Sequence, residues 1–153
     1  MALRRRLQKT TAPAPTTESL NGGELEWRDQ QLVVAQLLAR RYVADVDGLP
    51  DIGVLGATLD AWLDDDDTRV DINQVVNGLG IAVGQHVANA TGLEWVIATD
   101  QIGSDLALAG SPGDILVFPA NMIAKRLVGA ERGFLRPLFD RLVADIEARR
   151  SLG

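Results

Sequence analysis

The stretch from residue 94 to residue 126 constrains the fold of this chain most strongly. It contains three short runs rich in apolar residues, 95–100, 105–109 and 115–118, joined by connections that carry glycine, serine, proline and aspartate. Connections of this length and composition are typical of β-hairpins, so the runs are predicted to pair as an antiparallel meander. Such a small sheet needs a cover for its apolar face. We therefore predict an α+β fold, a three-stranded antiparallel β-meander packed against a bundle of about five α-helices.

Apolar residues that recur three and four positions apart predict helices on both sides of the meander. The helices are expected at about residues 24–44, 52–63, 72–91, 122–128 and from 135 onward. Asp51 and Asn121 are expected to cap the second and fourth helices, and Thr68 with Asp71 forms a candidate capping box for the third. We expect the second and third helices to back the sheet and the last two to close the fold.

Two glycines, Gly80 and Gly84, lie inside the third predicted helix. A glycine in a helix interior costs about 1 kcal/mol relative to alanine. This cost is understandable if another part of the protein approaches too closely for a side chain. We expect the sheet or another helix backbone to pass over this face.

The first 22 residues mix Thr, Pro, Ala and Gly with few large apolar side chains. Such a segment cannot repay the entropy lost on ordering. We predict a disordered tail over residues 1–22 and a single α+β domain over residues 23–153.

Charge and composition narrow the classes of function. The net charge is −6, but residues 1–23 carry four basic residues against one glutamate, or +3, which leaves −9 on the rest. An acidic body is a poor nucleic-acid binder, so no nucleic-acid partner is expected. Without cysteine, no disulfide or thiolate site can form, and no apolar stretch is long enough for a membrane span. We expect a cytoplasmic protein, with its oligomeric state open.

Patterns typical of catalysis and cofactor binding are weak. His86 is the only histidine, which does not suffice for an ordinary zinc site, and the acidic run 64–67 is better explained as a solvated loop. Ser104 lacks the glycine spacing of a nucleophile elbow. The glycines of residues 77–84, followed by Asp100, imitate a dinucleotide fingerprint, but the preceding segment has a helical start signal. No catalytic residue, metal or cofactor is predicted.

Several segments of the chain resemble a known family. They are the aromatic strand that ends in Thr99 and Asp100, the Asp-Leu-Ala-Leu strand, the Val-Phe-Pro-Ala-Asn segment before Lys125 and Arg126, and the preceding helix with Gly80 and Gly84. Over roughly residues 28–148 the chain resembles a small bacterial family of unknown function, the domain of unknown function 3806. The resemblance implies an α+β fold and a bacterial cytosolic protein, and it implies no activity.

One region near the end of the meander is the candidate binding site. Its residues are Asp100, Asp105, Asn121, Lys125, Arg126, Arg132 and Arg136. The basic residues either pair with the two aspartates or bind an anionic ligand or an acidic segment of a partner. The function expected is that of a non-catalytic protein-binding adaptor or regulatory module, with another protein as partner. The alternative is a small-molecule or nucleotide-binding domain, possibly enzymatic, that uses this cluster. A deep pocket there would favour the alternative, and an exposed apolar patch would favour protein binding.

Overall fold

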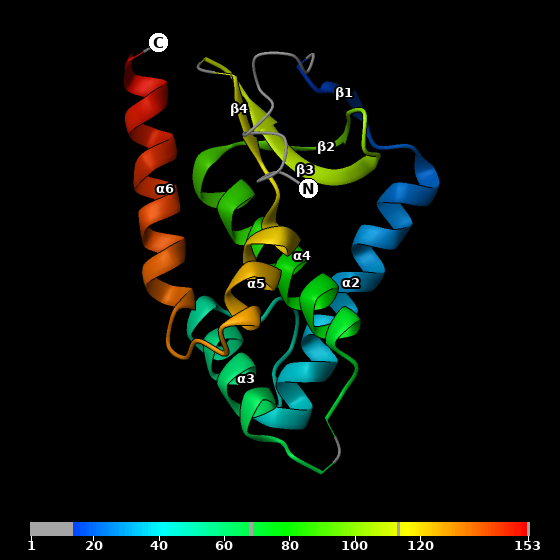
Figure 1. Cartoon of the computed structure of the whole chain (residues 1–153), viewed down its shortest axis with the longest axis vertical. Helices are drawn as coiled ribbons and strands as arrows, with labels where there is room; N and C mark the ends of the chain where they lie inside the picture. The colour runs from blue at the N-terminus through cyan, green and yellow to red at the C-terminus, as the bar shows by residue number, and fades with distance from the viewer. Residues whose placement is uncertain (1–13, 68, 113, 153) are drawn as a thin grey trace.

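The computed structural model describes residues 14–67, 69–112 and 114–152. It confirms the α+β class, with a four-stranded antiparallel sheet and five helices in the described part of the chain. The elements in chain order are β1 (Thr16–Ser19), α2 (Gly22–Tyr42), α3 (Ile52–Asp64), α4 (Ile72–Thr91), β2 (Glu94–Thr99), β3 (Ser104–Gly110), β4 (Ile115–Val117), α5 (Pro119–Val128) and α6 (Leu135–Leu152). The sheet lies at one end of the molecule and α3 near the other, and α4 runs between the two ends (Figure 1).

The predicted meander is present, and its strand order is β1-β2-β3-β4. Strand β2 pairs with β3 over its full length, with Glu94 opposite Ala109 and Thr99 opposite Ser104. Strand β4 continues the sheet, with Leu108 opposite Val117. The short turns expected from the sequence therefore set the antiparallel pairing.

The strand count and the predicted tail need correction. Residues Thr16–Ser19, placed in a disordered tail by the sequence prediction, form β1 and pair with β2 from Thr99 to Val96. All four residues of β1 are exposed, so the sequence has no alternation of apolar and polar residues that would predict this strand. It is held by backbone pairing at the edge of the sheet. Residues 1–13 of the predicted tail lie outside the described residues.

The helices form one core of their own. Buried residues from α2, α3, α4 and α5 meet there, among them Leu38, Leu55, Leu79 and Ile123. The second predicted helix, α3, belongs to this helical core and does not back the sheet as expected. Its start is as predicted, because the Asp51 carboxylate accepts a hydrogen bond of 2.8 Å from the Val54 amide.

A second core covers the sheet. Buried residues from the end of α4, from β3 and β4 and from α6 pack together there, including Val87, Leu108, Val117 and Ile146. Helix α4 contributes to both cores, since Leu79 and Val83 lie in the first and Val87 in the second. It is the element that joins the helical end of the molecule to the sheet.

The glycines of α4 explain how α5 lies so close to it. A Cβ atom built at Gly80 would lie 2.6 Å from the Cα atom of Ala120, and one built at Gly84 would lie 2.5 Å from the Trp95 ring. Atoms in ordinary packing lie about 3.5 to 4.0 Å apart. The expected close approach is confirmed: the α5 backbone passes over Gly80, and the side chains of Trp95 and Pro119 pass over Gly84. The glycine segment lies inside a helix and forms no phosphate loop.

Candidate functional site

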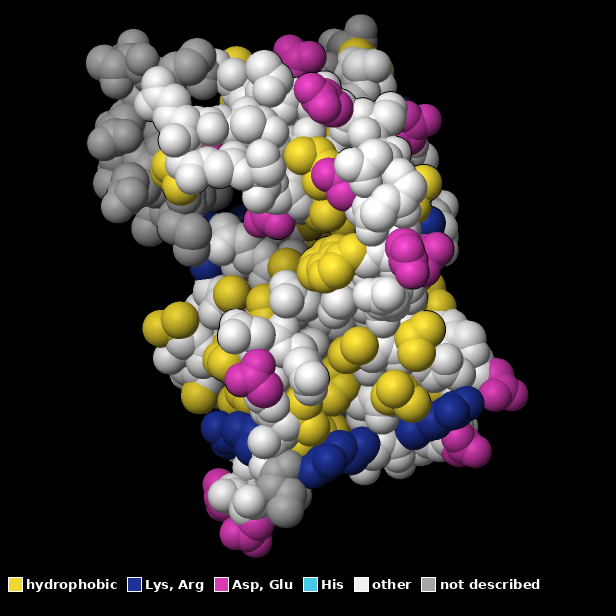
Figure 2. Space-filling model, turned by 90° about the vertical axis from the view of Figure 1, so that its right-hand side faces the viewer, with side chains coloured by type: hydrophobic (Ala, Val, Ile, Leu, Met, Phe, Trp, Pro, Cys, Tyr) yellow, Lys and Arg dark blue, Asp and Glu magenta, His cyan; other side chains and the backbone are white. Residues whose placement is uncertain are grey.

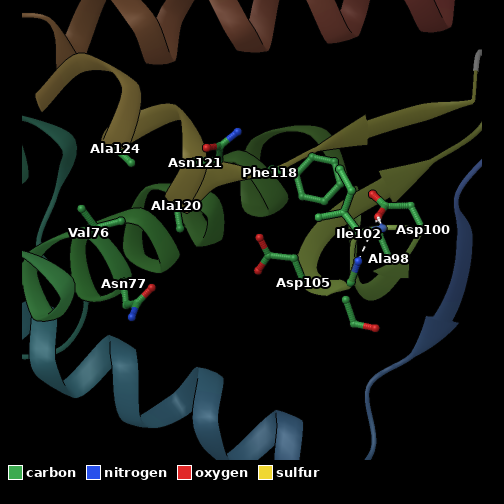
Figure 3. Close-up of a pocket in the computed structure, with 12 residues that line it drawn as sticks. Val76, Asn77, Ala98, Asp100, Ile102, Asp105, Phe118, Ala120, Asn121 and Ala124 are labelled. Atoms are coloured by element: carbon green, nitrogen blue, oxygen red, sulfur yellow. Dashed lines mark hydrogen bonds between the residues drawn. The ribbon is translucent and has the colours of Figure 1, made fainter. Parts of the chain in front are cut away.

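A cavity of about 380 Å³ opens between the β2–β3 turn, the first half of α4 and the start of α5. We call it the hairpin cavity. Its polar lining comes from three separate elements, which the fold brings together (Figure 3). The polar side chains are those of Asn77, Asp100, Ser104, Asp105 and Asn121.

Small apolar residues leave the room for this cavity. Alanines line it from β2 and from α5, and Val76, Ile102 and Phe118 complete its apolar walls. The alanines are Ala98, Ala120 and Ala124. Because Gly80 admits the backbone of Ala120, the start of α5 lies against α4 and closes this side of the cavity.

Asp100 shapes the turn beside the cavity. Its carboxylate accepts hydrogen bonds from the backbone amides of Ile102, at 2.6 Å, and Gly103, at 3.1 Å. The Asp100 amide in turn donates to the Gly103 carbonyl at 3.0 Å. These bonds fix the tight turn that delivers the next residues, Ser104 and Asp105, to the cavity. Asp100 thus has a structural role in the hairpin.

Asp105 is the charged group that faces the open space. It is paired across the sheet with Ala98, whose methyl group leaves free volume beside the carboxylate. Figure 3 shows the carboxylate directed into the space between the hairpin and α4. The side chain remains accessible, yet desolvation raises the pKa of Asp105 above its ordinary value, and a hydrogen bond from the Leu106 backbone lowers this pKa by less.

No basic side chain balances Asp105 within the described lining of the cavity, where Lys, Arg and His are absent. Desolvation without a compensating cation disfavours the ionised form of a carboxyl group. A positive charge beside Asp105 would favour its ionised form.

The two asparagines lie at different parts of the cavity. The Asn77 amide comes from α4 toward the same space as the Asp105 carboxylate, while the Asn121 amide points away from Asp105 in this view (Figure 3). The prediction that Asn121 caps the fourth helix is wrong. Helix α5 begins at Pro119, Phe118 is its N-cap residue, and no side chain caps it. Proline at the first helical position started the helix three residues before the expected start at Met122.

The predicted basic cluster does not converge on the cavity. Arg126 pairs with Glu131 at 3.5 Å, Arg132 with Asp64 at 2.7 Å, and Arg136 with Asp140 at 3.9 Å. Lys125 is exposed on α5. Of the seven candidate residues, the structure thus brings Asp100, Asp105 and Asn121 together around one cavity and places the four basic residues elsewhere. Binding by any of the seven stays a prediction.

Two other patterns in the sequence have structural partners. The Nε2 atom of His86 lies 2.8 Å from the carbonyl oxygen of Pro50, and its ring meets Phe139 edge-on. In the acidic run, Asp65 accepts a hydrogen bond of 2.6 Å from the Tyr42 hydroxyl. In the described part of the chain, no three His, Cys, Asp or Glu residues are grouped in a way that could hold a metal ion.

The sequence prediction missed Asn77 and the apolar lining of the cavity. Asn77 lies inside a helix, 28 positions before Asp105, and its type alone gives no signal of a site. The available signal in the sequence was the interior glycine Gly80, because a glycine there indicated that a second element packs closely against this part of α4.

The fold and the cavity define a class, an α+β domain with a small pocket between a β-hairpin and two helices. Residues 51–135, more than half of the chain, match the model of a protein family described as a domain of unknown function (DUF3806). The chain belongs to this family. All residues that we place around the hairpin cavity fall within the matched range. No curated protein and no solved structure matches the chain. Among the described helices, none has the length and apolar character needed to cross a membrane.

Proposed function

We propose that this protein is a non-catalytic binding domain for a small organic cation, such as a protonated amine, held in the hairpin cavity. One observation carries the proposal: the accessible Asp105 carboxylate is directed into a cavity whose described lining contains no basic side chain. The volume of about 380 Å³ lies at the lower end of the range of small-molecule pockets, about 300 to 1,000 Å³. A small ligand suits it.

The walls of the cavity suit such a ligand in two ways. Asp105 offers a charge-assisted acceptor for an N–H group, and the Asn77 amide supplies a further polar partner. The alanines and Phe118 offer apolar surface for the carbon skeleton. A bound cation would also offset the cost of keeping the Asp105 carboxylate ionised in a partly desolvated place.

A nucleotide or another anion is a poorer fit. Phosphate sites use Arg, Lys or clustered backbone amides. Arg126, Arg132 and Arg136 pair with acidic residues outside the cavity, and no described lining residue is basic.

The absence of catalysis is part of the proposal. It is supported by the roles of the polar groups in the lining. The Asp100 carboxylate accepts turn amides, and the Ser104 hydroxyl lies 2.8 Å from that of Thr99. No histidine stands beside Ser104 among the described lining residues to act as a base.

The test is a titration with small cations, followed by NMR of alanine methyl groups. The methyl groups of Ala98, Ala120 and Ala124 line the cavity and report on its occupancy. The probes are propylammonium, 1,4-diaminobutane, methylguanidinium and tetramethylammonium, with propionate as an anion of similar size. At least one cation should shift these three methyl resonances saturably, and propionate should not.

Two isosteric variants make the titration specific. Asp105→Asn removes the charge in the cavity and should raise the dissociation constant about tenfold or more, as expected for the loss of a hydrogen bond to a charged group. Asp66→Asn changes an exposed residue of the acidic run outside the cavity and should leave the dissociation constant unchanged. Failure of all four cations to bind, or equal binding by Asp105→Asn, would refute the proposal.

Protein binding is the second candidate function, and the exposed surface of α2 favours it. Val33 is 53% exposed and Leu37 is 54% exposed on this helix. If this surface serves a partner protein, Leu37→Glu should abolish complex formation with that partner and leave cation binding unchanged. A partner retained by Leu37→Glu would exclude this surface.

A further inference from the structure

Helix α2 carries apolar residues on two opposite sides. Ala35, Leu38 and Ala39 are buried on one side, in the interior of the protein. At 3.6 residues per turn, Val33 and Leu37 lie about 160° to 200° around the helix from Ala35 and face outward. Figure 2 shows the side of the molecule on which α2 lies, with hydrophobic side chains at the surface and Lys and Arg side chains gathered toward its lower end.

The outward side of a surface helix is ordinarily polar. Val33 and Leu37 instead form an apolar pair four residues apart, and both are more than half exposed. Such a pair in the middle of a 21-residue helix suits contact with another helix.

The charges on this face change sign along the helix. Glu26 and Asp29 lie exposed on the N-terminal side of the apolar pair, and Arg40 and Arg41 lie exposed on the C-terminal side. The arrangement is symmetric about position 35. If a second copy of the helix is laid antiparallel on the first, Val33 of one lies opposite Leu37 of the other. At 3.6 residues per turn, Asp29 and Arg40 lie on the same side of the face, so Asp29 of one copy lies near Arg40 of the other.

We propose that this face of α2 binds the same face of a second copy of the chain in a two-fold symmetric dimer. A two-fold interface requires a surface that is complementary to itself. The apolar pair meets the apolar pair, and the acidic half of each helix meets the basic half of the other. A parallel arrangement would place like charges together, so the charges also select the antiparallel orientation.

Local ion pairs do not oppose this contact strongly. Asp29 is 2.9 Å from Arg28, and Arg40 is 3.0 Å from Asp45 and 3.6 Å from Asp47. Arg40, Asp45 and Asp47 are all exposed, as is Asp29, and exposed ion pairs contribute little to stability. The pairs can be exchanged for contacts between the copies. With one helix from each copy, the interface lies at the small end of the known range, and the dimer is correspondingly weak.

The dimer is independent of the proposed cation binding. None of the described residues that line the hairpin cavity lies on α2, and α2 lies outside the residues matched by the family model. A protein that dimerises without binding cations, or binds cations without dimerising, would separate the two proposals.

The test is sedimentation velocity of the full chain at protein concentrations from about 1 μM to about 1 mM, the range in which a weak dimer associates. The wild-type protein should pass from monomer to dimer. Leu37→Glu should raise the dissociation constant about tenfold or more, because it brings two charges into the apolar centre of the interface. Val128→Glu is the matched control, because Val128 is 91% exposed on α5, and it should dimerise like the wild type.

A charge exchange tests the antiparallel register. Asp29→Arg alone should weaken the dimer, and Asp29→Arg combined with Arg40→Asp should restore it, since each copy then supplies both exchanged charges. Far-UV circular dichroism confirms that each variant is folded. A wild-type protein that stays monomeric up to about 1 mM, or a dimer that Leu37→Glu leaves intact, would overturn the proposal.

Discussion

The contact between Gly80 and Ala120 should make alanine unusually costly at position 80. Gly80→Ala adds a methyl group whose carbon would lie 2.6 Å from the Cα atom and 3.1 Å from the backbone nitrogen of Ala120. Ordinary packing needs about 3.5 to 4.0 Å, so the start of α5 must move by about 1 Å. This movement is resisted because Pro119, the neighbouring residue, is buried and packs over Gly84.

The magnitude follows from two opposing terms. Overpacking of a well-packed core costs about 1 to 3 kcal/mol. Replacing an interior helical glycine with alanine returns about 1 kcal/mol through helix propensity. Gly56→Ala in α3 is the matched control, because its new methyl group would meet only the Cβ atom of Leu135 at 3.6 Å, an ordinary contact. The propensity term cancels in the comparison, so Gly80→Ala should be less stable than Gly56→Ala by about 1 to 3 kcal/mol.

The measurement is urea unfolding of the wild type and both variants, with the slope of the free energy checked for constancy. The Gly80→Ala variant should also bind the cation more weakly, since Ala120 forms a wall of the hairpin cavity. Equal stability changes for the two substitutions would show that α5 does not press against Gly80, and the account of how the cavity is closed would be wrong.

Three further predictions concern charge and capping. Because the pKa of Asp105 is raised in the folded state, its ionisation destabilises the fold as the pH rises through that pKa. Asp105→Asn should therefore be more stable than the wild type at pH 7, and the gain in stability should shrink toward about pH 4. Urea unfolding at several pH values measures this gain, and the absence of such a trend would contradict the prediction. Combined Lys125→Gln and Arg126→Gln should change the free energy of unfolding by about 0.5 kcal/mol or less, since the Arg126–Glu131 pair is exposed, and a loss of about 3 kcal/mol would reveal a buried partner. Asn21→Ala should lower the free energy of unfolding by about 1 kcal/mol, because the Asn21 side chain accepts a hydrogen bond of 2.8 Å from the Glu24 amide in a capping box. A thermal or urea melt measures the loss, and an unchanged melt would show that the start of α2 does not depend on this cap.

Local chemistry allowed much of the fold to be predicted from the sequence. The residues between Thr99 and Ser104 specify a hairpin turn, and the Asp100 carboxylate holds it as such turns require. Asp51 caps α3 as predicted, and α4 ends at the predicted residue, Thr91, followed by Gly92 in the left-handed conformation. Each of these features depends on residues that are neighbours in the chain.

The remaining features depend on residues distant in the chain. Strand β1 is held by backbone pairing to β2 about 80 positions away, and its exposed side chains carry no apolar pattern. The basic residues of the candidate cluster were expected to lie near Asp100 and Asp105. Arg132 instead pairs with Asp64, at the end of α3. Asp105 was recognised as a candidate, whereas Asn77, which lines the same cavity, lies on a helix whose position against the hairpin only the tertiary structure shows.

The most direct test of cation binding is an NMR titration of the Asp105 carboxyl carbon against pH, in the absence and presence of the cation that binds most tightly. Without ligand, the pKa of Asp105 should lie above its ordinary value, because desolvation opposes ionisation. A saturating cation in contact with the carboxylate should lower this pKa by about one unit or more, the shift expected of an opposite charge at short range. An unchanged pKa of Asp105 at saturation would show that the cation binds elsewhere and would contradict the proposed function.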